Sequence, residues 1–247
     1  MNNKALEQHL NQLLVTDQYS DYAPNGLQVE GRREIGKVIL GVTASLALID
    51  QAIAENADAI VVHHGYFWQG EKQTITGIKQ RRIKALLEHD INLYAYHLPL
   101  DGHPELGNNA QLGRLWHIAD AAAIAPHDLL WTGTIDNVSA GDFADTITQT
   151  LKRQPLVIEG GQHRINSIAW CSGAAQGFLE RAAAVGVDAY VSGEVSEKTY
   201  HEAKEHGIHY FAAGHHATEC GGIKAIAGYL ASTCDLDTRF IDIVNPV

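Results

Sequence analysis

Short apolar runs alternate with longer amphipathic segments along most of this 247-residue chain. Runs of four to seven apolar residues rich in β-branched side chains predict buried strands, whereas apolar positions three and four apart predict helices. The clearest example is a strand at residues 38–42, a helix at 45–55 and a second strand at 59–62. Because a strand, a helix and a strand in that order form a parallel βαβ unit, we predict an α/β fold.

The pattern occurs twice. Residues 56–61 match residues 186–191, and residues 88–95 match residues 205–212. Each matched segment leads into polar residues at the end of a predicted strand. We therefore predict two similar αβ units with mostly parallel sheets, related by a pseudo-twofold internal repeat. Chance agreement between short αβ segments is the alternative.

The division into domains is less well marked than the repeat. One αβ unit is expected at residues 1–125 and the other at 126–247, but the boundary is soft because no linker rich in Pro, Ser or Gly separates them. The last strand is expected at residues 240–244. Pro99 argues against a regular helix through Asp101.

Polar residues follow the predicted strand at 59–62, where the chain reads His63, His64 and Gly65. In an open α/β sheet, ligands bind outside the carboxyl ends of the strands, so both imidazoles are well placed for chemistry. Adjacent strand residues point to opposite faces, which fits two neighbouring ions better than one ion held by both rings. The alternative is a pair of hydrogen-bonded histidines at a strand end.

Two other predicted strands also end in a histidine that a carboxylate follows four residues later. Imidazole and carboxylate ligands without thiolates suit Mn, Fe, Zn or Co. The sequence thus predicts a site for two divalent ions, of undetermined identity, with the candidate ligands His63, His64, His97, Asp101, His215 and Glu219.

A dinuclear site needs a bridging carboxylate and terminal ligands on each ion. The expected arrangement is Glu219 as the bridge, His63 and Asp101 on one ion, and His64 and His215 on the other. His97 is either a further ligand or a donor that orients Asp101. Ions about 3.5–4 Å apart would activate a shared water as a nucleophile near neutral pH, which favours hydrolysis as the reaction class.

Two further residues are candidates for proton transfer. Glu194 matches His64 in the repeat and is expected in the same cavity. His201 is the other candidate proton shuttle, although a lone histidine in a charged helix is more often a surface residue. The aromatic loop of residues 66–70 is a candidate lid or subunit contact, with core packing as the alternative.

Composition limits the classes of partner. The formal net charge of −11 makes a nucleic acid an unlikely partner. Cys171, Cys220 and Cys234 form no disulfide pattern, which suits a reducing compartment, and we expect a cytoplasmic protein. No apolar run approaches the roughly 20 residues that span a bilayer, so no membrane association is expected.

Several motifs together resemble the NGG-interacting-factor-like family, whose members are called GTP cyclohydrolase I type 2 homologues. They are the His-His-Gly at 63–65, the His-x-x-x-Asp at 97–101, the Gly-His-His-Ala-Thr-Glu at 214–219, and shorter matches at 25–28 and 192–194. The resemblance implies a two-domain αβ subunit, a di-metal site and ring-shaped homohexamers.

The same resemblance implies particular roles for individual residues. The implied ligands are His63, His64, Asp101, His215 and Glu219, with Glu194 and His201 near the cavity. The chain departs from the family where Leu98 and Pro99 replace a common Thr-Asn pair, and it lacks the large insert domain of some members.

The substrate is the least determined feature. The chain has no Gly-x-x-x-x-Gly-Lys-Ser/Thr loop, so a P-loop mode of GTP binding is not supported. The leading hypothesis is a metal-dependent hydrolase of a nucleotide-like or heterocyclic small molecule. The alternative is a non-catalytic metal-binding or metal-handling oligomer. A DNA-binding accessory role comes third, because the acidic composition weighs against it.

Overall fold

A computed structural model describes residues 1–247, which form two compact units. Unit 1 comprises Met1–Leu100 and Ile223–Val244, and unit 2 comprises Asp101–Gly222 and Asn245–Val247. The boundary expected near residue 126 therefore falls inside unit 2. The chain changes unit within α4 (Leu98–Gly102), within α10 (Cys220–Cys234) and again after Val244. Two of these changes fall inside helices, which explains why no linker marks them in the sequence.

Unit 1 contains a five-stranded sheet in the order β1-β4-β3-β2-β11. The strands are β1 (Gly26–Val29), β2 (Lys37–Thr43), β3 (Ala59–His64), β4 (Asn92–Ala95) and β11 (Asp237–Phe240). Strand β1 is antiparallel to β4, and the other pairings are parallel. The prediction of a mostly parallel sheet is confirmed in this unit.

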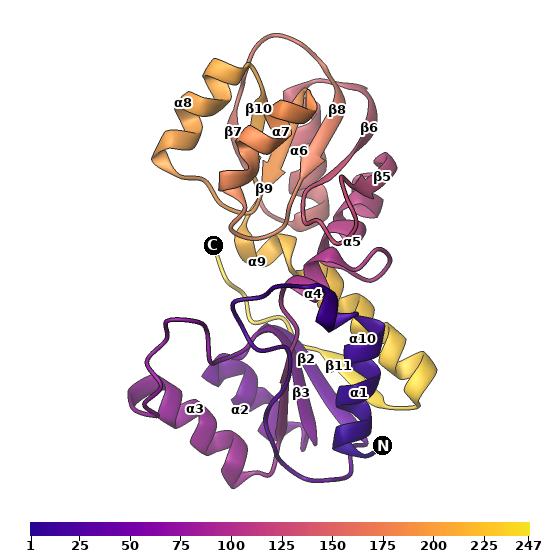
Figure 1. The fold of residues 1–247 in the computed structure, drawn as a ribbon, viewed down its shortest axis with the longest axis vertical. Coiled ribbons are helices and arrows are strands. Elements are labelled where there is room, and N and C mark those ends of the chain that lie inside the picture. The colour runs from indigo at the N-terminus through magenta and orange to yellow at the C-terminus, as the bar shows by residue number, and fades with distance from the viewer. The chain divides into compact units, whose positions relative to one another are not determined.

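Helices cover both faces of this sheet. Helices α2 (Leu46–Ala54) and α3 (Gly77–Glu88) lie on one side, and α1 (Asn3–Leu13) lies on the other (Figure 1). Leu48 and Leu86, from α2 and α3, are buried in one cluster with Ile60 of β3. Because both faces of β2 and β3 are covered, these strands are apolar almost throughout.

Unit 2 contains a six-stranded sheet in the order β5-β6-β8-β9-β10-β7. The strands are β5 (Ala119–Ala123), β6 (Trp131–Val138), β7 (Leu156–Ile158), β8 (Ile165–Trp170), β9 (Ala189–Ser192) and β10 (His209–Ala212). Strands β8, β9 and β10 are parallel, while β5, β6 and β7 join by antiparallel pairings. This sheet is thus mixed, and its antiparallel part includes β5, an Ala-rich strand without a sequence signal.

Helices again cover both faces of the second sheet. One cluster joins α5 (Asn108–Leu115) and α6 (Ala140–Leu151) to the sheet through Trp170, and another joins α7 (Leu179–Val185) and α8 (Glu197–His206) through Tyr190. The remaining short elements are α9 (His215–Thr218) and two 3-10 turns, Thr16–Gln18 and Gln176–Phe178.

The predicted repeat is visible in the strand register of each unit. Ala59 of β3 pairs with Asn92 of β4, and the matching Ala189 of β9 pairs with His209 of β10. The side chain of Asp58 accepts the backbone N–H groups of residues 36 and 37, and that of Asp188 accepts those of 166 and 167, all at 2.9 Å. Chance agreement between short segments does not produce the same register and the same carboxylate contacts twice.

Two local predictions are wrong. The last strand, expected at 240–244, is β11 at Asp237–Phe240, which begins three residues earlier and ends four residues earlier. A helix does run through Asp101, because Pro99 is the second residue of α4. Proline is tolerated in the first helical turn, where its missing N–H would have had no intrahelical partner.

Candidate metal centre

Unit 1 brings three of the predicted ligands together at the carboxyl ends of two neighbouring strands. His63 and His64 end β3, and His97 follows β4, which is parallel to β3. One ring nitrogen from each lies within 4.8 Å of the others. The rings of His63 and His64, the last two residues of β3, have centroids only 4.5 Å apart.

The hydrogen-bond partners of two of these rings determine which nitrogen is available to an ion. Nδ1 of His63 lies 3.0 Å from the backbone oxygen of Tyr96, and Nδ1 of His97 lies 2.8 Å from a carboxylate oxygen of Asp21. The backbone oxygen of Tyr96 can only accept a hydrogen bond, and so can the carboxylate of Asp21 when it is ionised. Nδ1 therefore carries the proton in each ring, and Nε2 has the lone pair.

Asp21 contacts the candidate ligand His97, and the sequence analysis did not single it out. Besides His97, it accepts the backbone N–H of Leu98 at 2.9 Å and the side-chain amide of Asn25 at 2.9 Å. Burial raises the pKa of Asp21, but the hydrogen bonds from His97, Asn25 and Leu98 outweigh burial and lower the pKa to about 2. Asp21 is therefore ionised over the whole physiological range and orients His97.

The aromatic loop after β3 packs against the same histidines. Tyr66 is buried and donates its hydroxyl to the backbone oxygen of Ala44 at 2.7 Å, which is core packing. Trp68 instead lies edge-on to His97, with ring centroids 4.9 Å apart, and 6.0 Å from the ring of His64. Part of the loop thus anchors the unit, and part flanks the histidine cluster.

Unit 2 holds three further candidates in one chain of contacts. His215 begins α9, so Glu219 lies one helical turn later, and Nε2 of His215 is 3.1 Å from Oε1 of Glu219. On the other side of the ring, Nδ1 is 2.6 Å from Oε1 of Glu194. Burial lowers the pKa of His215, but the hydrogen bonds and charges of Glu219 and Glu194 outweigh it and raise the pKa to about 9.

A glycine makes room for the Glu219 carboxylate. Gly173 has φ of +65°, and a Cβ at this position would lie 2.3 Å from Oε1 of Glu219 and 3.4 Å from Nε2 of His215. Only glycine tolerates both the backbone conformation and the close approach. The space that Gly173 leaves therefore accommodates the carboxylate of Glu219 next to the ring of His215.

Asp101 is also buried in unit 2, where two neutral donors orient it. Oδ1 of Asp101 accepts the Asn108 amide at 2.9 Å and the Ser172 hydroxyl at 2.7 Å. Neither donor was singled out in the sequence, since a lone Ser or Asn carries no signal there. Burial, and then the charges of Asp101 and Glu219 among others, raise the pKa of the nearby Cys171 thiol, so this cysteine is a neutral packing group.

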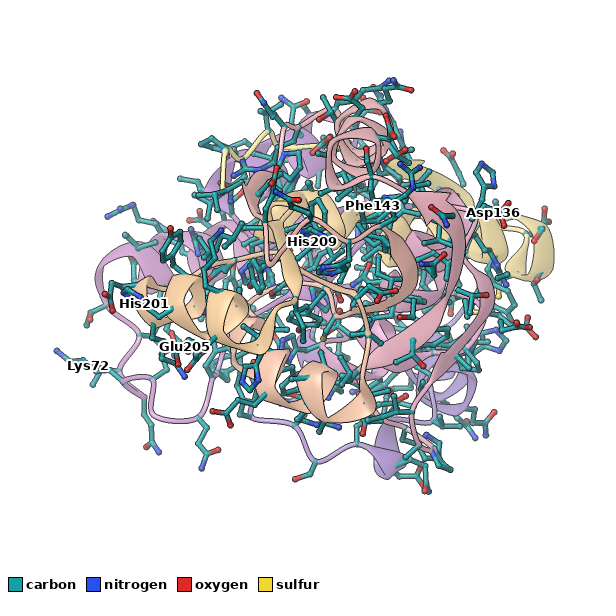
Figure 2. The ribbon with its side chains drawn as sticks, turned by 90° about the horizontal axis from the view of Figure 1, so that it is seen from above. Lys72, Asp136, Phe143, His201, Glu205 and His209 are labelled. Carbon is teal, nitrogen blue, oxygen red and sulfur yellow. The ribbon has the colours of Figure 1, made fainter.

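His201 lies away from these contacts within unit 2. Its side chain is 63% exposed on α8, and its nearest carboxylate is Glu197 of the same helix at 3.6 Å. Figure 2 shows His201 and Glu205 on the outer side of α8, whereas His209 lies farther inside the molecule.

The donor set fits divalent metal ions in both units. A histidine that binds a metal through one ring nitrogen typically has its other ring nitrogen hydrogen-bonded to an oxygen. Carboxylate ligands are typically oriented by hydrogen bonds as well. Such N and O ligands suit Mn, Fe, Zn or Co.

Comparison with known proteins supports the motif resemblance over the whole chain. The family model of Duf34/NIF3 (NGG1p interacting factor 3) matches residues 1–246. The chain belongs to the DUF34/NIF3 family. It is 54% identical over 250 residues to the "GTP cyclohydrolase 1 type 2 homolog" of Haemophilus influenzae, with all of both chains covered.

Solved structures agree with the family assignment. This DUF34/NIF3 protein superposes on the structure of protein ybgI with a TM-score of 0.97 at 51% identity, with all of both chains covered. The structure of TTHA1606 from Thermus thermophilus matches with a TM-score of 0.91 at 34% identity, again over both whole chains. The predicted family and the α/β class are thus confirmed. No helix of the chain has the length and apolar character needed to cross a membrane.

Proposed function

We propose that this DUF34/NIF3 protein is a di-metal-dependent hydrolase of a nucleotide-like or heterocyclic small molecule. Glu219 would be the ligand shared by two ions, with His63 and Asp101 holding one ion and His64 and His215 the other. His97 would be a further ligand or a donor that orients Asp101. This assignment follows from the motifs and their family resemblance.

The orientation of the histidines is the observation that best supports the proposal. His63, His97 and His215 each have Nδ1 within 3.0 Å of an oxygen acceptor, and Nδ1 of His64 is 3.2 Å from the Thr43 hydroxyl. In the rings of His63, His97 and His215, whose partners are a carbonyl or carboxylate oxygen, Nε2 is therefore the nitrogen presented to a ligand. Histidines that serve only to fill a core have no reason to share this orientation.

Bound ions would lower the pKa of a coordinated water toward 7 and polarise the substrate oxygen. The protein supplies the rest of the chemistry. Glu194 keeps the ring of His215 in place and, being half-exposed, is the better candidate for accepting a proton from the nucleophile. His201 is a weaker candidate because it is exposed and pairs with Glu197.

The remaining parts of the proposal concern substrate, assembly and location. The name of the Haemophilus relative, a homologue of a GTP cyclohydrolase, supports a nucleotide-like substrate. The family resemblance supports a homohexamer. Three cysteines without a disulfide support a cytoplasmic location.

Metal content and turnover test the proposal together. We expect the purified protein to contain close to two equivalents of a transition metal by elemental analysis. It should also hydrolyse at least one member of a panel of nucleotides, heterocycles and phosphoesters. The variant Glu219→Gln should lose turnover, while the control Glu205→Gln, on the exposed face of α8, should not. Reversible metal exchange without any turnover would instead support the metal-handling alternative.

A further inference from the structure

A second feature of unit 2 adjoins the candidate metal ligands but is not among them. It is a cavity of about 540 Å³ whose wall includes Arg153, Leu156, Glu194, Val195 and Ala212. Sites for small molecules usually have volumes of about 300–1,000 Å³, so this cavity has the size of a small-molecule site. Glu194 belongs both to the wall and to the contact with His215.

Arg153 places a positive charge in this wall, which also contains the carboxylate of Glu194. Its Nη1 donates to the backbone oxygen of Pro246, and its Nε is buried without an acceptor. Arg153 forms no ion pair with a carboxylate, although the chain carries 29 acidic residues against 18 basic ones. A half-buried guanidinium normally has a charged or hydrogen-bonding partner, so a missing acceptor requires an explanation.

The side chain of Arg153 is held in place by the turn that carries His215. Gly214 has φ of +101°, and a Cβ on it would lie 2.5 Å from both Cδ and Nε of Arg153. The arginine therefore packs directly on the residue before His215. Its position relative to the candidate metal ligands of unit 2 is fixed by backbone packing.

We propose that Arg153 binds an anionic oxygen group, phosphate or carboxylate, of the small molecule that the cavity accepts. The inference rests on the proposed function for the identity of that molecule as a substrate. A guanidinium can donate two parallel hydrogen bonds to such a group, and the bound oxygens supply the counter-charge. The rest of the substrate then extends toward Glu194 and His215.

Anion titration of metal-depleted protein tests this directly, because it needs neither metal nor turnover. Inorganic phosphate, pyrophosphate and succinate are titrated separately at low ionic strength by calorimetry. We expect Arg153→Gln to weaken binding of the preferred anion by about tenfold or more. Lys152→Gln, which removes the neighbouring exposed charge, should change it less than about twofold. Preference for phosphate or pyrophosphate over succinate identifies a phosphorylated ligand, and the reverse preference a carboxylate.

The possible failures are distinguishable. Equal anion affinity in wild type and Arg153→Gln, or no anion binding to wild type, would overturn the role of Arg153 whatever the metal content. If the protein contains no metal and shows no turnover but still binds anions through Arg153, only the proposed hydrolase function is overturned. If a thermal melt shows that Arg153→Gln is not folded, Arg153→Lys replaces it, because lysine keeps the charge but loses the paired donors. Anion affinity equal to wild type in Arg153→Lys would overturn the proposal.

Discussion

Nδ1 of His215 lies 2.6 Å from Oε1 of Glu194, a residue 21 positions earlier in the chain. The two residues come from different elements of unit 2, since Glu194 follows β9 and His215 begins α9. This contact fixes the ring orientation and increases the basicity of Nε2.

Glu194→Gln should therefore weaken metal binding. Glutamine can still accept from Nδ1, so the ring orientation is kept while the charge is lost. We expect metal affinity to fall about 10–100-fold in a competition assay with a chelator, the usual cost of changing a residue behind a metal-binding histidine. Glu197→Gln, whose side chain is 89% exposed, is the control. Equal affinity in the two variants would show that Glu194 does not support a metal ligand.

Metal binding should depend on pH through His215. Because the pKa of His215 is raised to about 9 in the metal-free protein, an ion must displace a proton from the ring at neutral pH. We expect affinity to rise by up to about tenfold per pH unit below pH 9. Calorimetry in buffers of different ionisation enthalpy measures the released protons, and affinity independent of pH between about 6 and 8 would contradict the assignment of His215 as a ligand.

The same raised pKa predicts how the stability of the metal-free protein changes. The charged ring stabilises the fold fully below the ordinary pKa of 6.5, and this contribution is lost as the pH rises through about 9. Urea unfolding at a series of pH values should show the loss in wild type. His215→Gln should not show it.

Asp21→Asn should affect both the fold and the histidine cluster of unit 1. The lost charge weakens the hydrogen bonds to His97, Leu98 and Asn25, and we expect the free energy of unfolding to fall by about 1–3 kcal/mol. Since the pKa of Asp21 is lowered to about 2, its contribution is present above pH 3.8 and is lost as the pH falls toward 2. Asp17→Asn, at an exposed carboxylate, is the control in urea unfolding. Equal stability of the two variants would refute the prediction.

Gly173→Ala should displace the carboxylate of Glu219. The positive φ alone costs about 1–2 kcal/mol for alanine, and the new Cβ cannot remain 2.3 Å from Oε1 of Glu219. We expect a lower melting temperature together with loss of metal binding. Gly177→Ala is the matched control, because its Cβ would meet no atom within 4 Å. Retained metal affinity in Gly173→Ala would show that Glu219 is not a ligand in this position.

Much of the fold could be read from local pattern. The strands expected at 38–42 and 59–62 and the helix expected at 45–55 agree with β2, β3 and α2 to within one or two residues, because each buries an apolar face that its own sequence encodes. Strand β5 was missed because Ala-rich segments have little strand propensity, and it forms by pairing with β6. The helix at Asp101 was missed because Pro99 is unfavourable only inside a helix and not in its first turn.

The sequence by itself determined the family, the α/β class and the placement of histidines at strand ends, since all three depend on residue types and on spacing along the chain. Only the tertiary structure decided what orients them: Asp21 behind His97, Glu194 behind His215, and the space that Gly173 leaves for Glu219. It also decided that Arg153 faces a cavity without a carboxylate partner. These relationships join residues far apart in sequence, and a hydrogen bond depends on distance in space, which local pattern does not encode.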